Sequence, residues 1–281
     1  MKDKMKYPGY RKMDQRELQL FQVKVMKRVH DFCVENNITY YMICGTFLGA
    51  IRHKGFIPWD DDMDIALLRK DYDRLIELFP KKFNKEDLCI QNYLTDKHYY
   101  PGHARISIGG SLKAQPSLAH FKDYNMQMYI DIFPLDKVPT EEKLQCLQEK
   151  EIRKLESQIK DKVYRIFSHD NKLTIFLKKV RGFIASIHSI TYLQQRRDAI
   201  MKQYNDTSSD VVCSMASHYS YKKQSMPIEL YGTPKLYQFE DEYFYGPEHA
   251  DEYLSRIYGD NYMQLPPIEK RSKPNDNYIK I

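Results

Sequence analysis

The sequence is poor in cysteine and contains no long apolar run. Its 281 residues include only five cysteines, an odd number with no Cys-x-x-Cys pair and no Cys/His cluster at zinc-site spacing. A disulfide framework is therefore excluded, and the thiols are expected to be reduced, as in the cytoplasm. No apolar run approaches the roughly 18 residues that span a bilayer, and residues 1–18 are too charged for a signal peptide. We expect a cytoplasmic protein without a transmembrane helix or a cleaved leader.

The chain nevertheless has ample material for a core, and its positive charge is concentrated in one stretch. Hydrophobic residues make up 42% of the sequence, which excludes a disordered chain. The net charge is +6, and residues 151–202 carry twelve Lys/Arg against five Asp/Glu. Apolar residues recur there at helical spacing from Phe176 to Ile187. We expect this stretch either to contact the inner face of an anionic membrane or to form an ordinary solvated helical surface.

Helical and strand patterns alternate along the chain. Apolar residues at helical spacing, capped by Asp14, predict a first helix up to Glu35. Runs rich in β-branched, aromatic or alternating apolar residues predict strands at 38–43, 62–68, 88–93, 103–108, 126–133, 211–215 and 235–245. Further helices are predicted at 46–53, 71–79, 141–167, 171–204 and 247–258. The tail from Leu265 onward is polar and is expected to be irregular.

Strands intermixed with helices indicate an α+β fold, in which a mixed β-sheet is flanked by helices. We divide the chain into a core at 1–140, a helical insertion at 141–205 and a C-terminal part at 206–281 that completes the core. The boundaries follow the change from strand-forming sequence to long, charged sequence without proline. The core contains the motif that carries the chemistry.

The most informative stretch runs from Gly45 to Ile65 and reads GTFLGAIRHKGFIPWDDDMDI. Four aspartates fall within residues 60–64, and their mutual repulsion indicates that something positive binds there. On a strand, Asp62 and Asp64 would share one face. Paired hard oxygen ligands of this kind suit Mg²⁺, with Mn²⁺ as the alternative.

A second ion at such a site would need a third carboxylate. We choose Asp131, which stands alone among the apolar residues of a predicted strand. Asp136 is the alternative and is expected in a loop, because it follows Pro134. The predicted catalytic acids and metal ligands are therefore Asp62, Asp64 and Asp131.

Groups able to bind phosphate precede the acids. The Gly45-Thr46 turn lies between a predicted strand and a predicted short helix, whose N-terminal amides favour an anion. Arg52 and Lys54 add positive charge nearby, at the end of the predicted helix and just after it. His53 stands between them and is interpreted as an orienting residue, because no second His or Cys stands at ligand spacing.

Three further residues complete the predicted substrate-binding set. Trp59 either offers its face to a base or a quaternary ammonium or packs the loop down. Asp61 either adds a ligand or only solubilises a turn. Arg105, on a predicted strand, either neutralises phosphate or forms a surface ion pair.

These residues lead to a family resemblance. Gly-Thr followed by Asp-x-Asp, with an acid on a later strand, resembles the nucleotidyltransferase superfamily that includes DNA polymerase β. The whole string from Gly45 to Ile65 resembles the LicD family, which includes bacterial phosphocholine transferases and is distantly similar to the fukutin-related ribitol-phosphate transferases. The resemblance continues through HARI at 103–106, IDIFPLD at 130–136, and LPP and KR within 265–271. Cys44 departs from the family, many members of which have a glycine there.

The resemblance implies a nucleotidyltransferase-type fold and a reaction. A substituted phosphate, most often phosphocholine, would pass from a CDP-activated donor to a hydroxyl of a glycan or its lipid-linked precursor, with release of CMP. The glycan would belong to lipopolysaccharide, teichoic acid or capsule. By the same resemblance, Asp62 and Asp64 would bind the metal, and Asp131 would complete the site or act as general base. Donor phosphates would be held by Gly45, Thr46, Arg52 and Lys54.

Other functions stay open on the sequence. The donor would be CDP-ribitol or CDP-glycerol in one alternative, and in another a true nucleotidyltransferase would release pyrophosphate. A metal- or glycan-binding module without catalysis is a third alternative, although the acids lack the glycine-interrupted layout of a calcium-binding loop. No nucleic-acid partner is expected, because the basic charge lies away from any recognition motif.

Overall fold

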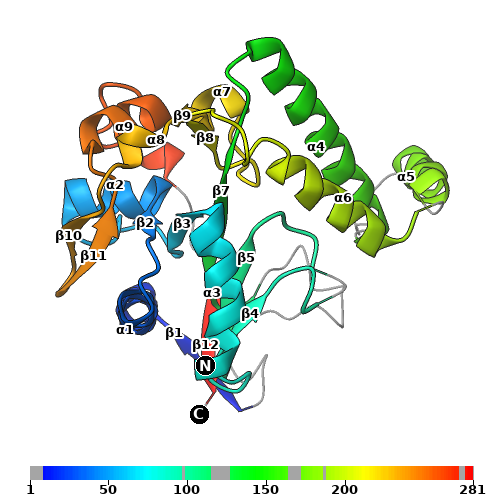
Figure 1. Ribbon diagram of the computed structural model, residues 1–281. Helices are drawn as coiled ribbons and strands as arrows, with labels where there is room; N and C mark the ends of the chain where they lie inside the picture. The colour runs from blue at the N-terminus through cyan, green and yellow to red at the C-terminus, as the bar shows by residue number, and fades with distance from the viewer. Residues whose placement is uncertain are drawn as a thin grey trace. The chain divides into compact units, whose positions relative to one another are not determined.

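The computed structural model describes residues 9–96, 99–114, 127–163, 172–185, 188–271 and 276–280 (Figure 1). The chain forms two compact units. Unit 1 draws on Met1–Ile90, Arg105–Ile132 and Leu230–Ile281, and unit 2 on Gln91–Ala104 and Phe133–Glu229. Among the described residues, no helix is both long and apolar enough to cross a membrane. The three-part division expected from the sequence stays a prediction.

The helices of unit 1 begin and end where local signals place them. In α1 (Gln15–Glu35), the Asp14 side chain accepts the N–H of Glu17 at 2.8 Å and so caps the first turn. The other helices of unit 1 are α2 (Cys44–His53), α3 (Arg69–Lys82) and α9 (Ala250–Tyr258), with the short α8 (Ile228–Tyr231) at its boundary. The helices predicted at 14–35, 46–53 and 71–79 are confirmed. The last one begins at Ala250 rather than at Pro247.

The central sheet has the strand order β2-β3-β7-β5-β4. These strands are β2 (Tyr41–Met42), β3 (Asp64–Leu68), β7 (Tyr129–Lys137), β5 (Ala104–Ile108) and β4 (Leu88–Gln91). β2 and β3 are antiparallel, with Met42 opposite Ile65. A sheet flanked by helices is therefore confirmed, and it contains the expected strands except 235–245. The strand expected from residue 62 begins at Asp64, so Asp62 lies in the loop before it. Of the predicted strand 126–133, Met126 lies outside the described residues.

Two small sheets complete unit 1. β12 (Asp276–Lys280) pairs antiparallel with both β1 (Tyr10–Met13) and β6 (Ser111–Ala114), so the expectation of an irregular tail is wrong. The stretch 235–245 is a hairpin of β10 (Lys235–Phe239) and β11 (Glu242–Gly246), packed beside α2 and α1 (Figure 1). Its turn contains Glu240 with φ of 57°. The turn at Glu240 therefore divides the stretch 235–245 into two strands, although residues on both sides of the turn have strand-forming composition.

Unit 2 is mainly helical. Its long helices are α4 (Glu142–Val163), α5 (Lys172–Ala185) and α6 (Ile190–Lys202). The helical character predicted for 141–167 and 171–204 is confirmed within the described residues, but the second stretch forms two helices, because Ser189 caps a new one by accepting the N–H of Tyr192 at 3.1 Å. α4 packs beside α5 and α6 (Figure 1). Its other elements are α7 (Tyr221–Gln224), β8 (Val211–Cys213) and β9 (Met226–Pro227). Residues of α4, α6 and β8, including Ile152, Ile159 and Cys213, share one buried apolar cluster.

Candidate metal and phosphate site

The acidic residues lie on a loop that α1 holds in place. Side-chain amides of α1 donate to main-chain oxygens of this loop, from Gln15 and Gln19 to Asp60 O at 3.2 and 3.0 Å, and from Gln22 to Asp61 O at 3.2 Å. Spacings of four and three residues put the three amides on one side of the helix. Because they bind the backbone, these amides position the loop without neutralising its carboxylates.

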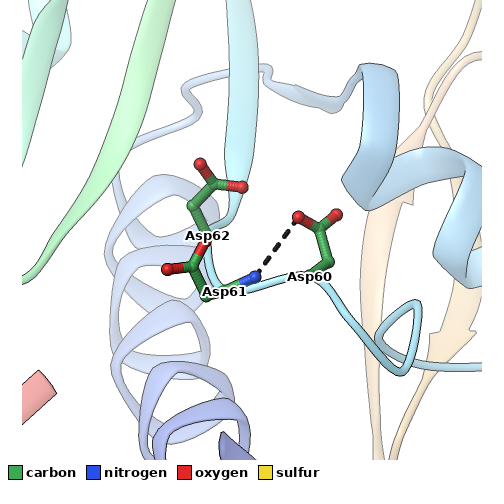
Figure 2. Close-up of side chains that lie close together, drawn as sticks. All are labelled: Asp60, Asp61 and Asp62. Carbon is green, nitrogen blue, oxygen red and sulfur yellow. Dashed lines mark hydrogen bonds between the residues drawn. The ribbon is translucent and has the colours of Figure 1, made fainter. Parts of the chain in front are cut away.

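Asp60, Asp61 and Asp62 bring their carboxylates together (Figure 2). One oxygen from each lies within 4.8 Å of the others, and all three side chains are half-buried. The Asp60 carboxylate accepts the N–H of Asp61 at 3.2 Å (Figure 2). The three carboxylates are thus arranged so that they could hold a metal ion.

Burial and mutual repulsion disfavour the charged forms of the acids. Burial, followed by the charges of Asp62 and Asp61, raises the pKa of Asp60 to about 8. Burial also raises the pKa of Asp62, and it raises the pKa of Asp64 well above the ordinary value, with repulsion from Asp62 and Asp131 adding to it. A bound cation would reverse these shifts, because it stabilises the carboxylates.

The Gly45-Thr46 turn forms the first turn of α2 and meets the start of β3. The buried Thr46 hydroxyl accepts the N–H of Asp64 at 2.8 Å, and the N–H of Ile43 donates to Asp64 O at 3.1 Å. A Cβ built on Gly45 would lie 2.8 Å from Asp60 Oδ2. Glycine therefore lets this carboxylate approach the N-terminal turn of α2.

Cys44 occupies the first position of α2 with a positive φ of 48°. A glycine would adopt such a backbone at no steric cost. The side chain is buried, and the N–H of Cys44 donates to the Tyr253 hydroxyl at 3.2 Å. A tertiary contact to α9 therefore helps to hold a residue other than glycine in this conformation.

Asp131 forms a buried ion pair with Arg105. The Arg105 Nε lies 2.6 Å from Asp131 Oδ1, and each side chain is 12% exposed. The N–H of Asp131 donates to Met63 O at 3.0 Å, which aligns β7 with the loop that precedes β3. The ion-pair interpretation of Arg105 thus describes its geometry, except that the pair is buried rather than at the surface.

Lys113 is a second cation near the acids, and the sequence analysis did not single it out. It is 4% exposed, and its Nζ lies 3.7 Å from Asp61 Oδ2. Burial lowers the pKa of Lys113, but Tyr129 and the acids outweigh burial and raise it. No sequence signal identifies this lysine, because it comes near the acids through the pairing of β6 with β12.

The ring of Tyr129, which lies on the same strand β7 as Asp131, contacts both of these cations. Arg105 Cζ is 3.7 Å and Lys113 Nζ is 4.7 Å from the ring centroid. Cation–π attraction holds both charges near the ring while their hydrogen-bonding groups remain directed at acids. The site therefore combines crowded carboxylates with the buried Lys113 and the half-buried Arg105.

The cationic end of α2 serves the structure in part. Arg52 Nη1 donates to Tyr262 O at 2.7 Å and to Gln264 O at 3.2 Å, which attaches the segment after α9. Burial lowers the pKa of Arg52. Burial, followed by the charge of Arg52, also lowers the pKa of the half-buried His53, so this imidazole is neutral at pH 7. The Lys54 side chain is exposed, and its phosphate-binding role stays a prediction.

Two glycines of the motif are explained by packing. A Cβ on Gly49 would lie 2.5 Å from Gly55 O, and a Cβ on Gly55 would collide with the Glu240 carboxylate. Glu240 accepts the N–H of Phe56 at 3.0 Å and is paired with Arg16 at 2.7 Å. The hairpin turn at Glu240 therefore contacts and positions the loop between α2 and the acids. The sequence did not predict this role of Glu240.

Trp59 is half-buried and already faces a cation. Arg271 Cζ lies 4.3 Å from the centroid of its ring, and the His53 ring meets it edge-on at 6.3 Å. Arg271 also donates from Nε to Pro266 O at 3.2 Å. The indole thus anchors the C-terminal segment, and it shows that a cationic group fits against one of its faces.

The expectation that Asp136 lies in a loop is wrong. This residue lies within β7, opposite Cys213 of β8, and is completely buried. Its Oδ1 accepts the side-chain amide of Asn205 at 2.6 Å, and Asn205 Oδ1 accepts the N–H of Lys137 at 2.7 Å. Pro134 does not end the strand, because β7 continues past it and pairs with β8 at Asp136 and Lys137.

Residues 37–168 match the family model described as LicD/FKTN/FKRP, nucleotidyltransferase domain. The matched range includes the acidic loop, Arg105, Lys113 and Asp131. The chain is also similar to the lipopolysaccharide cholinephosphotransferase LicD of Haemophilus influenzae, with 29% identity over 277 residues, 94% of this chain and 97% of the relative.

Two shorter similarities involve uncharacterized proteins. RP689 of Rickettsia prowazekii is 42% identical over 72 residues, which are 26% of each chain. RT0683 of Rickettsia typhi is 40% identical over 72 residues, 26% of this chain and 23% of the relative.

Proposed function

Because residues 37–168 belong to the LicD/FKTN/FKRP nucleotidyltransferase domain family, we propose that the protein is a metal-dependent phosphocholine transferase. It would move phosphocholine from CDP-choline to a hydroxyl of a cell-surface glycan or its lipid-linked precursor and release CMP. The observation that carries the proposal is similarity over 94% of the chain to a lipopolysaccharide cholinephosphotransferase. The crowded carboxylates beside α2 supply the chemistry that such a reaction needs.

The acids would hold the metal, with Mg²⁺ as the proposed ion and Mn²⁺ as its substitute. Asp62 and Asp64 are the proposed principal ligands, supported by Asp60 and Asp61 at the same loop. A divalent ion bound there would neutralise phosphate oxygens and favour in-line displacement. The raised pKa values of Asp60, Asp62 and Asp64 fit this role, because they reflect first burial and then repulsion among the acids, and a bound cation would offset both.

The acceptor hydroxyl would attack the phosphorus that carries choline. The bond from this phosphorus to the oxygen bridging to CMP would break, CMP would leave with that oxygen, and the hydroxyl proton would pass to a base. Asp131, held by Arg105 at 2.6 Å, either takes this proton or completes the metal site. Lys113 would offset the negative charge of the bound donor, since it is buried within 3.7 Å of Asp61.

The first turn of α2, at Gly45 and Thr46, would bind the donor phosphates through its N-terminal amides. Lys54 is exposed and able to reach a ligand, whereas Arg52 would act mainly by holding the segment after α9. For the choline ammonium we propose the Trp59 ring, which accommodates the Arg271 guanidinium at 4.3 Å.

The direct test measures CMP release from CDP-choline, CDP-ribitol and CDP-glycerol, with Mg²⁺ or Mn²⁺ and a panel of oligosaccharide acceptors. Release of CMP from CDP-choline, and not from CDP-ribitol or CDP-glycerol, would support the proposal. Turnover of CDP-ribitol or CDP-glycerol without CDP-choline would replace the donor and keep the mechanism. Pyrophosphate released from a nucleoside triphosphate, without CMP from any CDP donor, would instead indicate a nucleotidyltransferase.

The choline site has a narrower test. Trp59→Leu should raise the KM for CDP-choline while leaving the KM for a poorly used CDP-glycerol unchanged, and Trp59→Phe should restore most of the difference. An equal effect on both donors would show that Trp59 only packs the loop.

A further inference from the structure

The helix α5 presents an apolar face to solvent. Four of its residues lie at spacings of three, one and three along the helix and have large exposed fractions, at Leu173 (67%), Phe176 (62%), Leu177 (51%) and Val180 (41%). With about 3.6 residues per turn, these positions share one side of the helix. A face of this kind, on a helix packed beside α4, is typical of a surface that another phase or molecule covers.

The charge of α5 indicates what covers that face. The segment Lys172–Ala185 contains four Lys/Arg and no Asp/Glu. By helical spacing, positions 172 and 179 border the exposed face on one side and position 181 borders it on the other. A second protein surface would need matching acids along both borders, whereas an anionic lipid surface offers negative charge on every side.

We propose that α5 lies in the interface of an anionic membrane, with its apolar face among the acyl chains and its cations at the headgroups. Long cationic side chains suit this position, because their stems remain apolar while their charges reach the phosphates. The binding surface is separate from the acidic loop, and its existence does not depend on the proposed reaction. Such binding would bring the protein to any acceptor that is carried by lipid.

The experiment uses the full-length protein and vesicles of phosphatidylcholine, either alone or mixed with phosphatidylglycerol. We expect co-sedimentation with the anionic vesicles only, weakened by added salt because charge attraction is screened beyond about 10 Å at 0.1 M. The double variant Phe176→Ser, Leu177→Ser should bind about tenfold less or worse, since it removes two apolar side chains from the buried face. Leu94→Ser is the matched control, because Leu94 is 68% exposed outside α5.

A double charge-reversal variant tests the electrostatic contribution to vesicle binding separately from the apolar one. Lys172→Glu with Lys179→Glu should abolish the preference for phosphatidylglycerol, and Lys143→Glu with Lys150→Glu, the same change on exposed positions of α4, should leave most of it. Circular dichroism checks that each variant keeps its helices.

The position of the helix can be read from fluorescence. Phe176→Trp in a Trp59→Phe background carries one tryptophan, whose emission should shift to the blue when anionic vesicles are added. Equal binding to both vesicle types, or equal loss in the Leu94→Ser control, would overturn the proposal. A stable dimer that the Phe176→Ser, Leu177→Ser variant dissociates would also overturn it, because a second copy would then cover the face.

Discussion

Asp131 and Asp136 stand on the same strand, β7, yet their surroundings have little in common. Asp131 belongs to unit 1, pairs with the Arg105 guanidinium at 2.6 Å and contributes to the repulsion that raises the pKa of Asp64. Asp136 belongs to unit 2 and accepts a neutral amide from Asn205 at 2.6 Å. A carboxylate among cations and other acids is suited to chemistry, whereas one satisfied by a neutral donor is suited to support the fold.

The largest expected effect comes from the acids before and at the start of β3. Asp62→Asn or Asp64→Asn should lower CMP release by several orders of magnitude, because each keeps the side-chain volume and removes charge that holds the ion. The melting temperature of the metal-free protein should hold or rise as repulsion is relieved. A large loss of melting temperature with activity reduced only in proportion to folded protein would mean a structural role.

Substitution of the two aspartates of β7 should have different effects on activity. Asp131→Asn should also abolish most activity, and because it leaves the buried Arg105 without its counter-charge, it should lower stability as well. Asp136→Asn should leave most activity intact. If Asp136→Asn abolishes turnover while Asp131→Asn retains it, the choice of the third carboxylate is wrong.

At Asp136 we expect substitution to lower the stability of the protein rather than its activity. Asp136→Ala leaves the half-buried Asn205 amide without this acceptor and should cost about 1–3 kcal/mol in urea unfolding, with kcat and KM of the folded fraction unchanged. Asn205→Ala should cost a similar amount, and the double variant less than the sum of the two. Additive losses would show that the two side chains do not support each other.

We expect the dependence of protein stability on pH and on Mg²⁺ to arise from the acids of the loop and not from Asp136. The pKa of Asp60 is raised from 3.8 to about 8, so the folded protein binds more protons than the unfolded chain between these values. Stability of the metal-free protein should therefore fall as pH rises toward 8, and stabilisation by Mg²⁺ should grow over the same range because the ion needs deprotonated acids.

Melting temperatures in EDTA and in Mg²⁺, recorded across this pH range, check both trends. Asp60→Asn should flatten both curves, and Asp136→Asn should leave them as they are. A metal-free melting temperature that rises with pH would contradict the assignment.

The smallest effect is expected from the amides that hold the loop. Gln19→Leu removes the bond to Asp60 O at 3.0 Å and should raise the Mg²⁺ concentration needed for half-maximal activity by about tenfold, at a cost of about 1 kcal/mol in stability. Gln148→Leu removes a comparable buried bond, to Ile200 O at 2.8 Å in unit 2. It should cost similar stability with no change in the Mg²⁺ requirement, and equal effects in both variants would remove the positioning role of Gln19.

Local sequence by itself determined the elements and the acidic motif. The capping residue Asp14 and helical spacing predict α1, and the string from Gly45 to Ile65 predicts a turn, a short helix and a strand that begins with acids. These features depend on neighbours a few residues away, where chain entropy favours contact. The family resemblance rests on the same short-range pattern.

Tertiary structure decided which groups surround the acids. Lys113 reaches Asp61 through the pairing of β6 with β12, a strand in a tail that looks irregular by composition. Glu240 reaches the loop from a hairpin turn far along the chain. Asp131 and Asp136 both lie on β7, and the elements packed against this strand make one an ion-pair partner and the other a buried acceptor. The charge state of a carboxylate depends on solvent exclusion and on groups within a few ångströms, and these are properties of the folded chain.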